Sequence, residues 1–197
     1  DACRDAVRRV VKTRIGDLEK SVGKHFGSTP VTVAGIVSGL STAMTRRGKM
    51  VRVMLDDGSG TEEIAVFPEA WDQYKHLLKE DELVVVQGKL SKDDYSGGHR
   101  LSVERILDLG TARGENARAL QLTIAGKPDA ARLRELLMPH RGDGSQGEGC
   151  PVEIHYYSDS ATAVLRLGHH WAVRPDDALL AGLKGWLTEA RVEMRYR

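Results

Sequence analysis

Val31-Thr32-Val33-Ala34-Gly35-Ile36-Val37 is the stretch that decides the fold of the first half of this chain. Larger apolar side chains alternate along it with smaller or polar ones, and β-branched residues are enriched, which is typical of a strand. Gly35 inside the run indicates a bulge or a sharp bend, because glycine weakens a straight strand and permits close backbone approach. The stretch therefore predicts the first, bent strand of a sheet.

Further strands follow at short intervals along the chain. After the basic turn Thr45-Arg46-Arg47-Gly48-Lys49 we expect strands over Val51–Leu55, Glu63–Phe67, Leu83–Leu90 and Leu101–Leu107. A helix is expected from Pro68 to about Glu80, with its aromatic residues facing the sheet. The order β-β-β-α-β-β is that of the OB fold, a five-stranded Greek-key barrel that often binds oligonucleotides. Residues 31–110 are therefore expected to form an OB-fold nucleic-acid-binding domain.

Two segments flank this domain. Residues 2–20 have apolar side chains at helical spacing, and residues 22–30 are rich in Gly, Ser and Pro. We therefore expect residues 1–30 to form a helical segment and a linker. After the domain, Thr111 to Arg118 is expected to be a short polar connection.

A second unit is expected over residues 118–197. Its predicted elements are a strand at Leu120–Ile124, a helix between Pro128 and Pro139, strands at Val152–Tyr156 and Ala163–Leu167, a helix after Pro175 and a last strand up to Arg197. The order is β-α-β-β-α-β. The predicted fold class is thus mixed β and α+β, with a five-stranded OB-fold barrel followed by a small α+β domain.

Composition narrows the classes of protein. With 197 residues, 41% hydrophobic and 29% charged, the chain is expected to fold as an ordinary soluble protein, and no apolar run approaches the ~20 residues of a membrane span. Cys3 and Cys150 lack metal-ligand or redox spacing, which suits a reducing cytoplasm. The chain begins without Met or a signal sequence, so we expect a fragment. Because 29 basic residues face 28 acidic ones, any affinity for nucleic acid must come from local clusters.

Two loops of the predicted barrel carry side chains suited to nucleic acid. In the first loop and the strand after it these are Arg46, Arg47, Lys49 and Arg52. In the loop between the fourth and fifth strands they are Lys92, Tyr95, His99 and Arg100. Cations can pair with phosphates and release counterions, and a ring can stack on a base. A solvated turn is the alternative for the first loop, and Asp93 and Asp94 weaken the case for the second.

No catalytic or metal site is predicted. Asp56 and Asp57 precede Gly-Ser-Gly, which favours a turn over paired metal ligands. His169 and His170 are neighbours and would point to opposite faces of a strand, which makes a poor metal pair. The aromatic residues Phe67, Trp71 and Tyr74 are expected to close the barrel end rather than to stack bases.

A partner-binding surface is predicted in the second unit. Trp and Arg are favoured anchors at protein interfaces. The candidate residues are Trp186, Arg191, Arg195 and Arg197, with a core position as the alternative for Trp186.

The motifs of both units resemble one family. The barrel stretches Val31 to Val37, Leu55-Asp56-Asp57-Gly58-Ser59-Gly60 and Val85-Val86-Gln87-Gly88-Lys89-Leu90 resemble the OB domain of the bacterial DNA polymerase III alpha subunit. Pro139-His140-Arg141 and Trp171-Ala172-Val173-Arg174-Pro175-Asp176-Asp177 resemble that subunit's extreme C-terminal domain.

This resemblance implies partners and an activity. The OB domain would bind single-stranded template DNA, the last domain would dock the clamp-loader tau subunit, and both would work with the rest of the polymerase chain. The magnesium-dependent active site of the parent polymerase would lie outside these residues, so no cofactor is expected in them. Two alternatives stay open: a tRNA-binding OB appendage of an aminoacyl-tRNA synthetase, and an interaction scaffold without affinity for nucleic acid.

Overall fold

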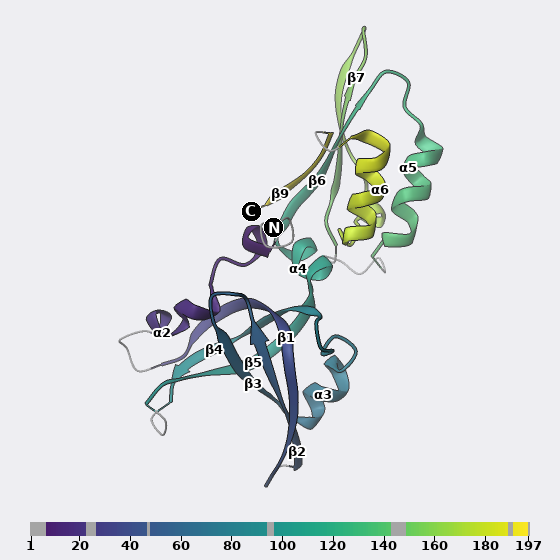
Figure 1. Cartoon of the computed structure of the whole chain (residues 1–197). Helices are drawn as coiled ribbons and strands as arrows, with labels where there is room; N and C mark the ends of the chain where they lie inside the picture. Colours follow the sequence, from purple (N-terminus) through teal and green to yellow (C-terminus); the bar gives the residue numbers. More distant parts are fainter. Residues whose placement is uncertain are drawn as a thin grey trace. The chain divides into compact units, whose positions relative to one another are not determined.

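The structure of the chain, a computed structural model, describes residues 7–22, 27–46, 48–93, 97–142, 149–188 and 191–196. The chain divides into two compact units, Asp1–Leu109 and Gly110–Arg197. Each unit has its own cluster of buried apolar side chains. Figure 1 shows a strongly curved sheet in the first unit and a sheet with two helices on one face in the second.

A five-stranded antiparallel sheet forms the first unit. Its strands are β1 (Thr29–Thr45), β2 (Gly48–Asp56), β3 (Thr61–Val66), β4 (Leu83–Lys92) and β5 (His99–Asp108), and α3 (Pro68–Tyr74) lies between β3 and β4. The strands pair in the order β3-β2-β1-β4-β5. The predicted order of five strands and one helix is therefore confirmed.

β1 is much longer than the predicted strand over residues 31–37. Residues 29–36 pair with β4, and residues 36–45 pair with β2. A β-bulge between Val37 and Gly39 bends the strand where the two ladders meet. At Gly35 the reason for glycine is close packing, because an added Cβ would lie 3.0 Å from Cβ of Leu55. One bent strand thus serves both halves of the sheet.

The two edge strands of this sheet approach each other without forming a ladder. Among the described residues, β3 pairs only with β2, and β5 pairs only with β4. A side-chain contact spans the seam instead: Nε2 of His99 on β5 lies 2.8 Å from Oε2 of Glu62 on β3. The sheet is therefore curled like a barrel and is not closed by backbone hydrogen bonds.

The N-terminal segment differs from the prediction. Residues 7–10 are helical, but the chain then runs through a 3₁₀ turn, η1 (Ile15–Asp17), into the short helix α2 (Leu18–Ser21). Ile15 and Leu18 are buried in the core of the sheet. A single helix over residues 2–20 is thus wrong for the described part, because apolar contact with the sheet outweighs continuous helix. The segment packs on the first unit.

The two other helical stretches also differ from their predicted limits. α3 ends at Tyr74, short of Glu80, with Trp71 and Tyr74 packed against the core as expected. The predicted polar connection from Thr111 instead forms most of α4 (Leu109–Asn116). Its Arg113 is only 4% exposed and bonds Oδ1 of Asp177 at 2.5 Å, a pairing that offsets the cost of burying the cation.

The second unit is a four-stranded sheet with helices on one face. Its elements are β6 (Ala117–Ala125), α5 (Ala130–Leu137), η2 (Met138–His140), β7 (Val152–Tyr157), β8 (Thr162–Arg166), η3 (His169–Trp171), α6 (Asp177–Leu187) and β9 (Val192–Tyr196). The strands pair in the order β8-β7-β6-β9, with β6 and β7 parallel. α5 and α6 cover one face of this sheet (Figure 1). The predicted order β-α-β-β-α-β is confirmed.

Within the described ranges, none of the helices has the length and apolar character needed to cross a membrane.

Candidate nucleic-acid interface

The basic residues predicted in the first loop do not share one face. Successive side chains of a strand point to opposite faces, and Lys49 and Arg52 are three positions apart on β2. Lys49 has the same parity as buried Val51 and Val53, whereas Arg52 lies on the outer face. Arg46 is exposed at the tip of the β1–β2 hairpin, and Arg47 lies outside the described residues. The predicted cluster therefore separates into a tip and two faces.

Arg52 is partly neutralised by its neighbour on β3. Its Nε lies 3.7 Å from Oε1 of Glu63, and both side chains are about half exposed. The sequence could not reveal this pair, because it depends on the register that places Arg52 opposite Ala65. Such an exposed pair contributes little to stability but lowers the local positive potential. Arg52 is the weaker candidate for a phosphate contact.

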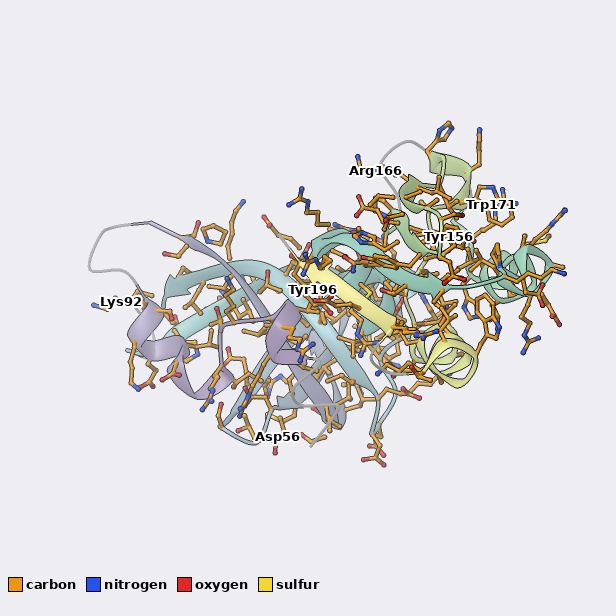
Figure 2. The ribbon with its side chains drawn as sticks, turned by 90° about the horizontal axis from the view of Figure 1, so that it is seen from above. Asp56, Lys92, Tyr156, Arg166, Trp171 and Tyr196 are labelled. Atoms are coloured by element: carbon orange, nitrogen blue, oxygen red, sulfur yellow. The ribbon has the colours of Figure 1, made fainter. Side chains whose placement is uncertain are left out.

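The second predicted loop also divides into different environments. Lys92 and His99 are paired at the ends of β4 and β5, and Arg100 follows as an exposed residue. The His99 ring is directed to Glu62, and its side chain is only 16% exposed, so it has a role in the seam. Lys92 projects from the end of its strand (Figure 2). Tyr95 lies outside the described residues.

The outer face beside this loop holds two polar contacts that sequence reasoning missed. Nζ of Lys89 lies 2.7 Å from Oε1 of Glu104, and Nη1 of Arg105 lies 3.5 Å from Oε1 of Gln87. The contact with Glu104, a hydrogen bond as well as an ion pair, raises the pKa of Lys89 above its ordinary value. The alternation of residues 85–91 contained this signal, because it places Gln87 and Lys89 on one face.

The turn between β2 and β3 has a structural role. Asp57 accepts hydrogen bonds from the backbone N–H groups of Ile15, Ser59 and Gly60, at 3.0, 2.8 and 3.2 Å, and from the Ser59 hydroxyl at 2.6 Å. Partial burial alone would raise the pKa of Asp57, but these hydrogen bonds outweigh it and lower the pKa below its ordinary value. The turn predicted from Asp56 to Gly60 is confirmed, and it also holds the N-terminal segment.

The residues predicted to bind a partner lie on opposite sides of the second unit. Trp186 on α6 is partly buried and packs against the core, together with Met194 of β9. Arg195 follows Met194 and therefore points to the face without helices, where Nη1 bonds Oε1 of Glu193 at 3.2 Å. Arg191 is exposed, and Arg197 lies outside the described residues. The structure does not bring Trp186 and Arg195 to a common surface.

A different basic surface, missed by sequence reasoning, lies where two family motifs meet. Cζ of Arg141 lies 4.9 Å from the ring centroid of Trp171, a cation–π contact, and Nε of Arg141 donates to the His170 carbonyl at 2.7 Å. His169 and Arg174 are exposed beside them. We call these five residues the Arg141–Trp171 surface; Figure 2 labels Trp171 in this unit.

This surface is held in place by the start of α6. Asp176 caps the helix by accepting from the backbone N–H of Leu179 at 2.9 Å, and its Oδ2 lies 2.9 Å from Nδ1 of His140. Partial burial would raise the pKa of Asp176, but these bonds and Arg174 lower it. Through Asp176, hydrogen bonds therefore connect the two motifs that contain His140 and Arg174.

Two features of the described residues concern metal binding and nucleophilic chemistry. They include no group of three or more His, Cys, Asp or Glu side chains placed to hold a metal ion. Cys150 is fully buried, and burial raises the pKa of its thiol to about 12, so it is poorly suited as a nucleophile. The exposed cations of these surfaces are groups that can pair with anions.

Comparison with known families assigns a domain to each unit. Residues 31–109 match the family described as "OB-fold nucleic acid binding domain". Residues 132–187 match "DNA polymerase III subunit alpha, C-terminal domain". The predicted OB fold is thereby confirmed for the first unit.

Curated relatives match both units at once. The DNA polymerase III subunit alpha of Pseudomonas aeruginosa is 37% identical over 196 residues, which cover 97% of this chain and 16% of the relative. The subunit of Escherichia coli K12 is 34% identical over 171 residues, which cover 84% of this chain and 14% of the relative. This chain thus spans only a small part of the length of the relatives.

Solved structures show weaker similarity. The hypothetical protein ygiW from E. coli has a TM-score of 0.36 and 20% identity and covers 48% of this chain and 86% of that one. A small single-stranded DNA-binding protein from Streptomyces coelicolor has a TM-score of 0.32 and 19% identity and covers 43% of this chain and 95% of that one. Similarity this low carries no conclusion about function.

The two domain matches and the curated relatives agree with one another along almost the whole chain. The sequence is therefore homologous to the C-terminal region of the bacterial DNA polymerase III alpha subunit, a DNA replication protein, and consists of an OB-fold domain followed by that subunit's C-terminal domain.

Proposed function

We propose that the OB-fold unit binds single-stranded template DNA beside the polymerase. One observation carries this proposal: four exposed cations stand at the ends of the two hairpins, and none forms an ion pair with a described residue. They are Arg46, Lys49, Lys92 and Arg100. Unpaired cations at loops that flank an OB sheet are suited to phosphates, and their affinity should fall with salt.

The test is fluorescence anisotropy of a labelled single-stranded oligomer over a salt series, using the whole chain. Arg46→Glu with Lys49→Glu should weaken binding and lower the slope of log affinity against log salt by about 1 for each phosphate that is no longer neutralised. Lys79→Glu, an exposed residue away from the hairpin ends, is a control for net charge.

Competitors decide between this proposal and its alternatives. Duplex DNA and folded tRNA should compete poorly with the single strand. Preference for tRNA would support the tRNA-binding alternative, and no binding at low salt would support a scaffold without nucleic-acid affinity.

We also propose that the second unit docks the clamp-loader tau subunit. The Arg141–Trp171 surface supports this proposal, because Trp and Arg are favoured interface anchors and here both are partly or fully exposed. Arg141→Glu should weaken binding of tau in a surface plasmon resonance assay. Arg195→Glu tests the basic strand that the sequence favoured, and a fall in binding only in this variant would assign docking to the opposite face.

A third proposal concerns chemistry. We infer that this stretch makes and breaks no bond, and that the magnesium-dependent nucleotide transfer of the parent polymerase depends on residues outside it. A primer-extension assay with Mg²⁺ should show no incorporation by this chain alone. Incorporation by the purified chain would contradict the proposal.

A further inference from the structure

The β1–β2 hairpin extends past the rest of its sheet. β3 pairs with β2 only as far as Val51, so the last pairs of the hairpin form a two-stranded ribbon. Figure 1 shows this end of β2 reaching beyond the sheet. At its turn Gly48 has φ 107°, a conformation that favours glycine. The ribbon is thus a projecting arm with side chains on two faces.

One face of the ribbon carries an unusually exposed apolar side chain. Met44 is 82% exposed, more than the other large hydrophobic side chains identified as exposed among the described residues. It stands directly opposite Lys49, so the two side chains share the face that has the parity of Val51. Because Met44 and Lys49 are both exposed and do not pack in the core, their side chains contribute no buried surface to folding.

A groove runs along this face, between the ribbon and α3. Its volume is about 350 Å³, near the lower end for small-ligand sites. Its lining includes Leu40, Lys49, Val51, Pro68 and Trp71.

The groove is bounded on one side by the start of α3. Pro68 approaches the hairpin turn closely, since a Cβ on Gly48 would lie 3.7 Å from its Cγ. The acidic residue in the lining, Asp72, is exposed and is paired with Lys75 at 3.4 Å. Ser41 and Thr42 complete the lining, so the groove combines apolar side chains with small hydroxyl groups and the Lys49 cation.

These surroundings suit a nucleobase joined to phosphates. Trp71 is partly buried against the core and also lines the groove, so a flat ring in the groove can lie against it. Met44 does not line the groove, but it stands beside it on the same face of the ribbon, opposite the lining residue Lys49, where its flexible thioether can reach the edge of such a ring. Lys49 and the tip residue Arg46 would then stand beside the flanking phosphates. An acidic peptide could pair with the cations, but its side chains would offer no flat ring to pack against the apolar lining.

We propose that this groove, which we call the α3 groove, takes up one unstacked base of a single-stranded DNA. The proposal rests on the proposed DNA binding of the first unit and adds a second contact point, separate from the outer face that holds Arg52. The protein would then contact DNA at the ribbon through one base as well as through the phosphates.

The experiment has two independent readouts on the intact chain. Anisotropy of a labelled oligothymidylate reports whether single-stranded DNA binds at all. ¹⁹F NMR of the chain labelled with 5-fluorotryptophan gives one resonance for each of the 3 tryptophans, and Trp71→Phe assigns the one from the groove. On binding, the Trp71 resonance should shift while the other two stay.

A pair of methionine variants supplies the control. Met44→Ala should weaken binding about two- to tenfold, the range of sulfur–aromatic contacts. Met138→Ala should not change it, because Met138 is an exposed methionine of the second unit, at 47%, and lies outside the proposed site. An oligomer with abasic sites should bind wild type and Met44→Ala equally, because it keeps the phosphates and lacks the bases.

The outcomes separate this inference from the proposed function. If the oligomer binds but the Trp71 resonance stays and Met44→Ala binds as wild type, the α3 groove is not a base site and template binding stands. If the abasic oligomer shifts Trp71 as fully as the normal one, the contact is to the backbone and the inference fails. If no oligomer binds at low salt, both proposals fail.

Discussion

Asp57 shows how much a single side chain does in this fold. Its carboxylate organises the β2–β3 turn and also receives the backbone N–H of Ile15, whose side chain is buried in the core. Because its pKa is lowered in the folded state, its ionised form stabilises that state above the unfolded pKa, and this stabilisation is lost as pH falls through the folded pKa. The affected range lies below the ordinary aspartate value of 3.8.

Asp57→Ala should lower the free energy of unfolding by about 1–3 kcal/mol, because several donors lose a partly buried acceptor. Urea denaturation at neutral pH measures the change, and Asp72→Ala, which removes only an exposed ion pair, is the control. In acid the variant should lose less stability than wild type. Equal acid sensitivity of the two proteins would show that other carboxylates dominate.

The sequence predicted which types of residue form the candidate sites, but it predicted only part of their arrangement in space. The two loops with their cations could be found from composition and turn signals. That Lys49 and Arg52 face opposite ways follows from strand period and could have been deduced. The pairs of Arg52 with Glu63 and of His99 with Glu62 could not, because they depend on strand register and on the curl of the sheet. Arg141 and Trp171 meet only through long-range packing.

Strands β4 and β5 show how an element depends on one glycine. The pairing passes from Gln87↔Arg105 to Gly88↔Val103, which leaves Glu104 as an extra residue in β5. A Cβ on Gly88 would lie 2.3 Å from the carbonyl oxygen of Ser102. The bulge thus brings two backbones closer than any side chain allows.

Gly88→Ala should destabilise the protein by about 1–3 kcal/mol, the usual effect of overpacking. Gly185→Ala is the matched control, because its added Cβ meets nothing within 4 Å inside α6. That variant should gain up to about 1 kcal/mol from helix propensity. Thermal unfolding followed by circular dichroism compares them, and a neutral Gly88→Ala would mean that the bulge can relax.

At the level of elements, the sequence predicted the order of the strands well, but it predicted poorly the residues at which elements begin and end. Alternation located the nine strands that the described residues form, but β1 was expected to end at Val37 because the small and polar residues 38–45 dilute the pattern. Pairing with β2 keeps those residues extended. Likewise α2 was expected within a longer helix, since contact with the sheet core is invisible to a local pattern.

The whole molecule consists of two units with separate cores. A core of its own generally allows a domain to fold alone. A fragment of residues 1–109, the first unit, should therefore unfold cooperatively and retain its amide NMR spectrum for β1 to β5. It should also bind single-stranded DNA as the whole chain does. A collapsed spectrum would show that the first unit needs the second for its stability.

The double pairing of β1 has a consequence for the order of folding. Its hairpin with β2 closes a short loop, whereas its ladder with β4 joins Thr29 to Leu90, near the far end of the unit. Loop closure costs entropy that rises with loop length, so the β1–β2–β3 meander should form first and recruit β4 and β5 later. Substitutions in β4 and β5 should then act mainly on the rate of unfolding, and substitutions in the meander on the rate of folding.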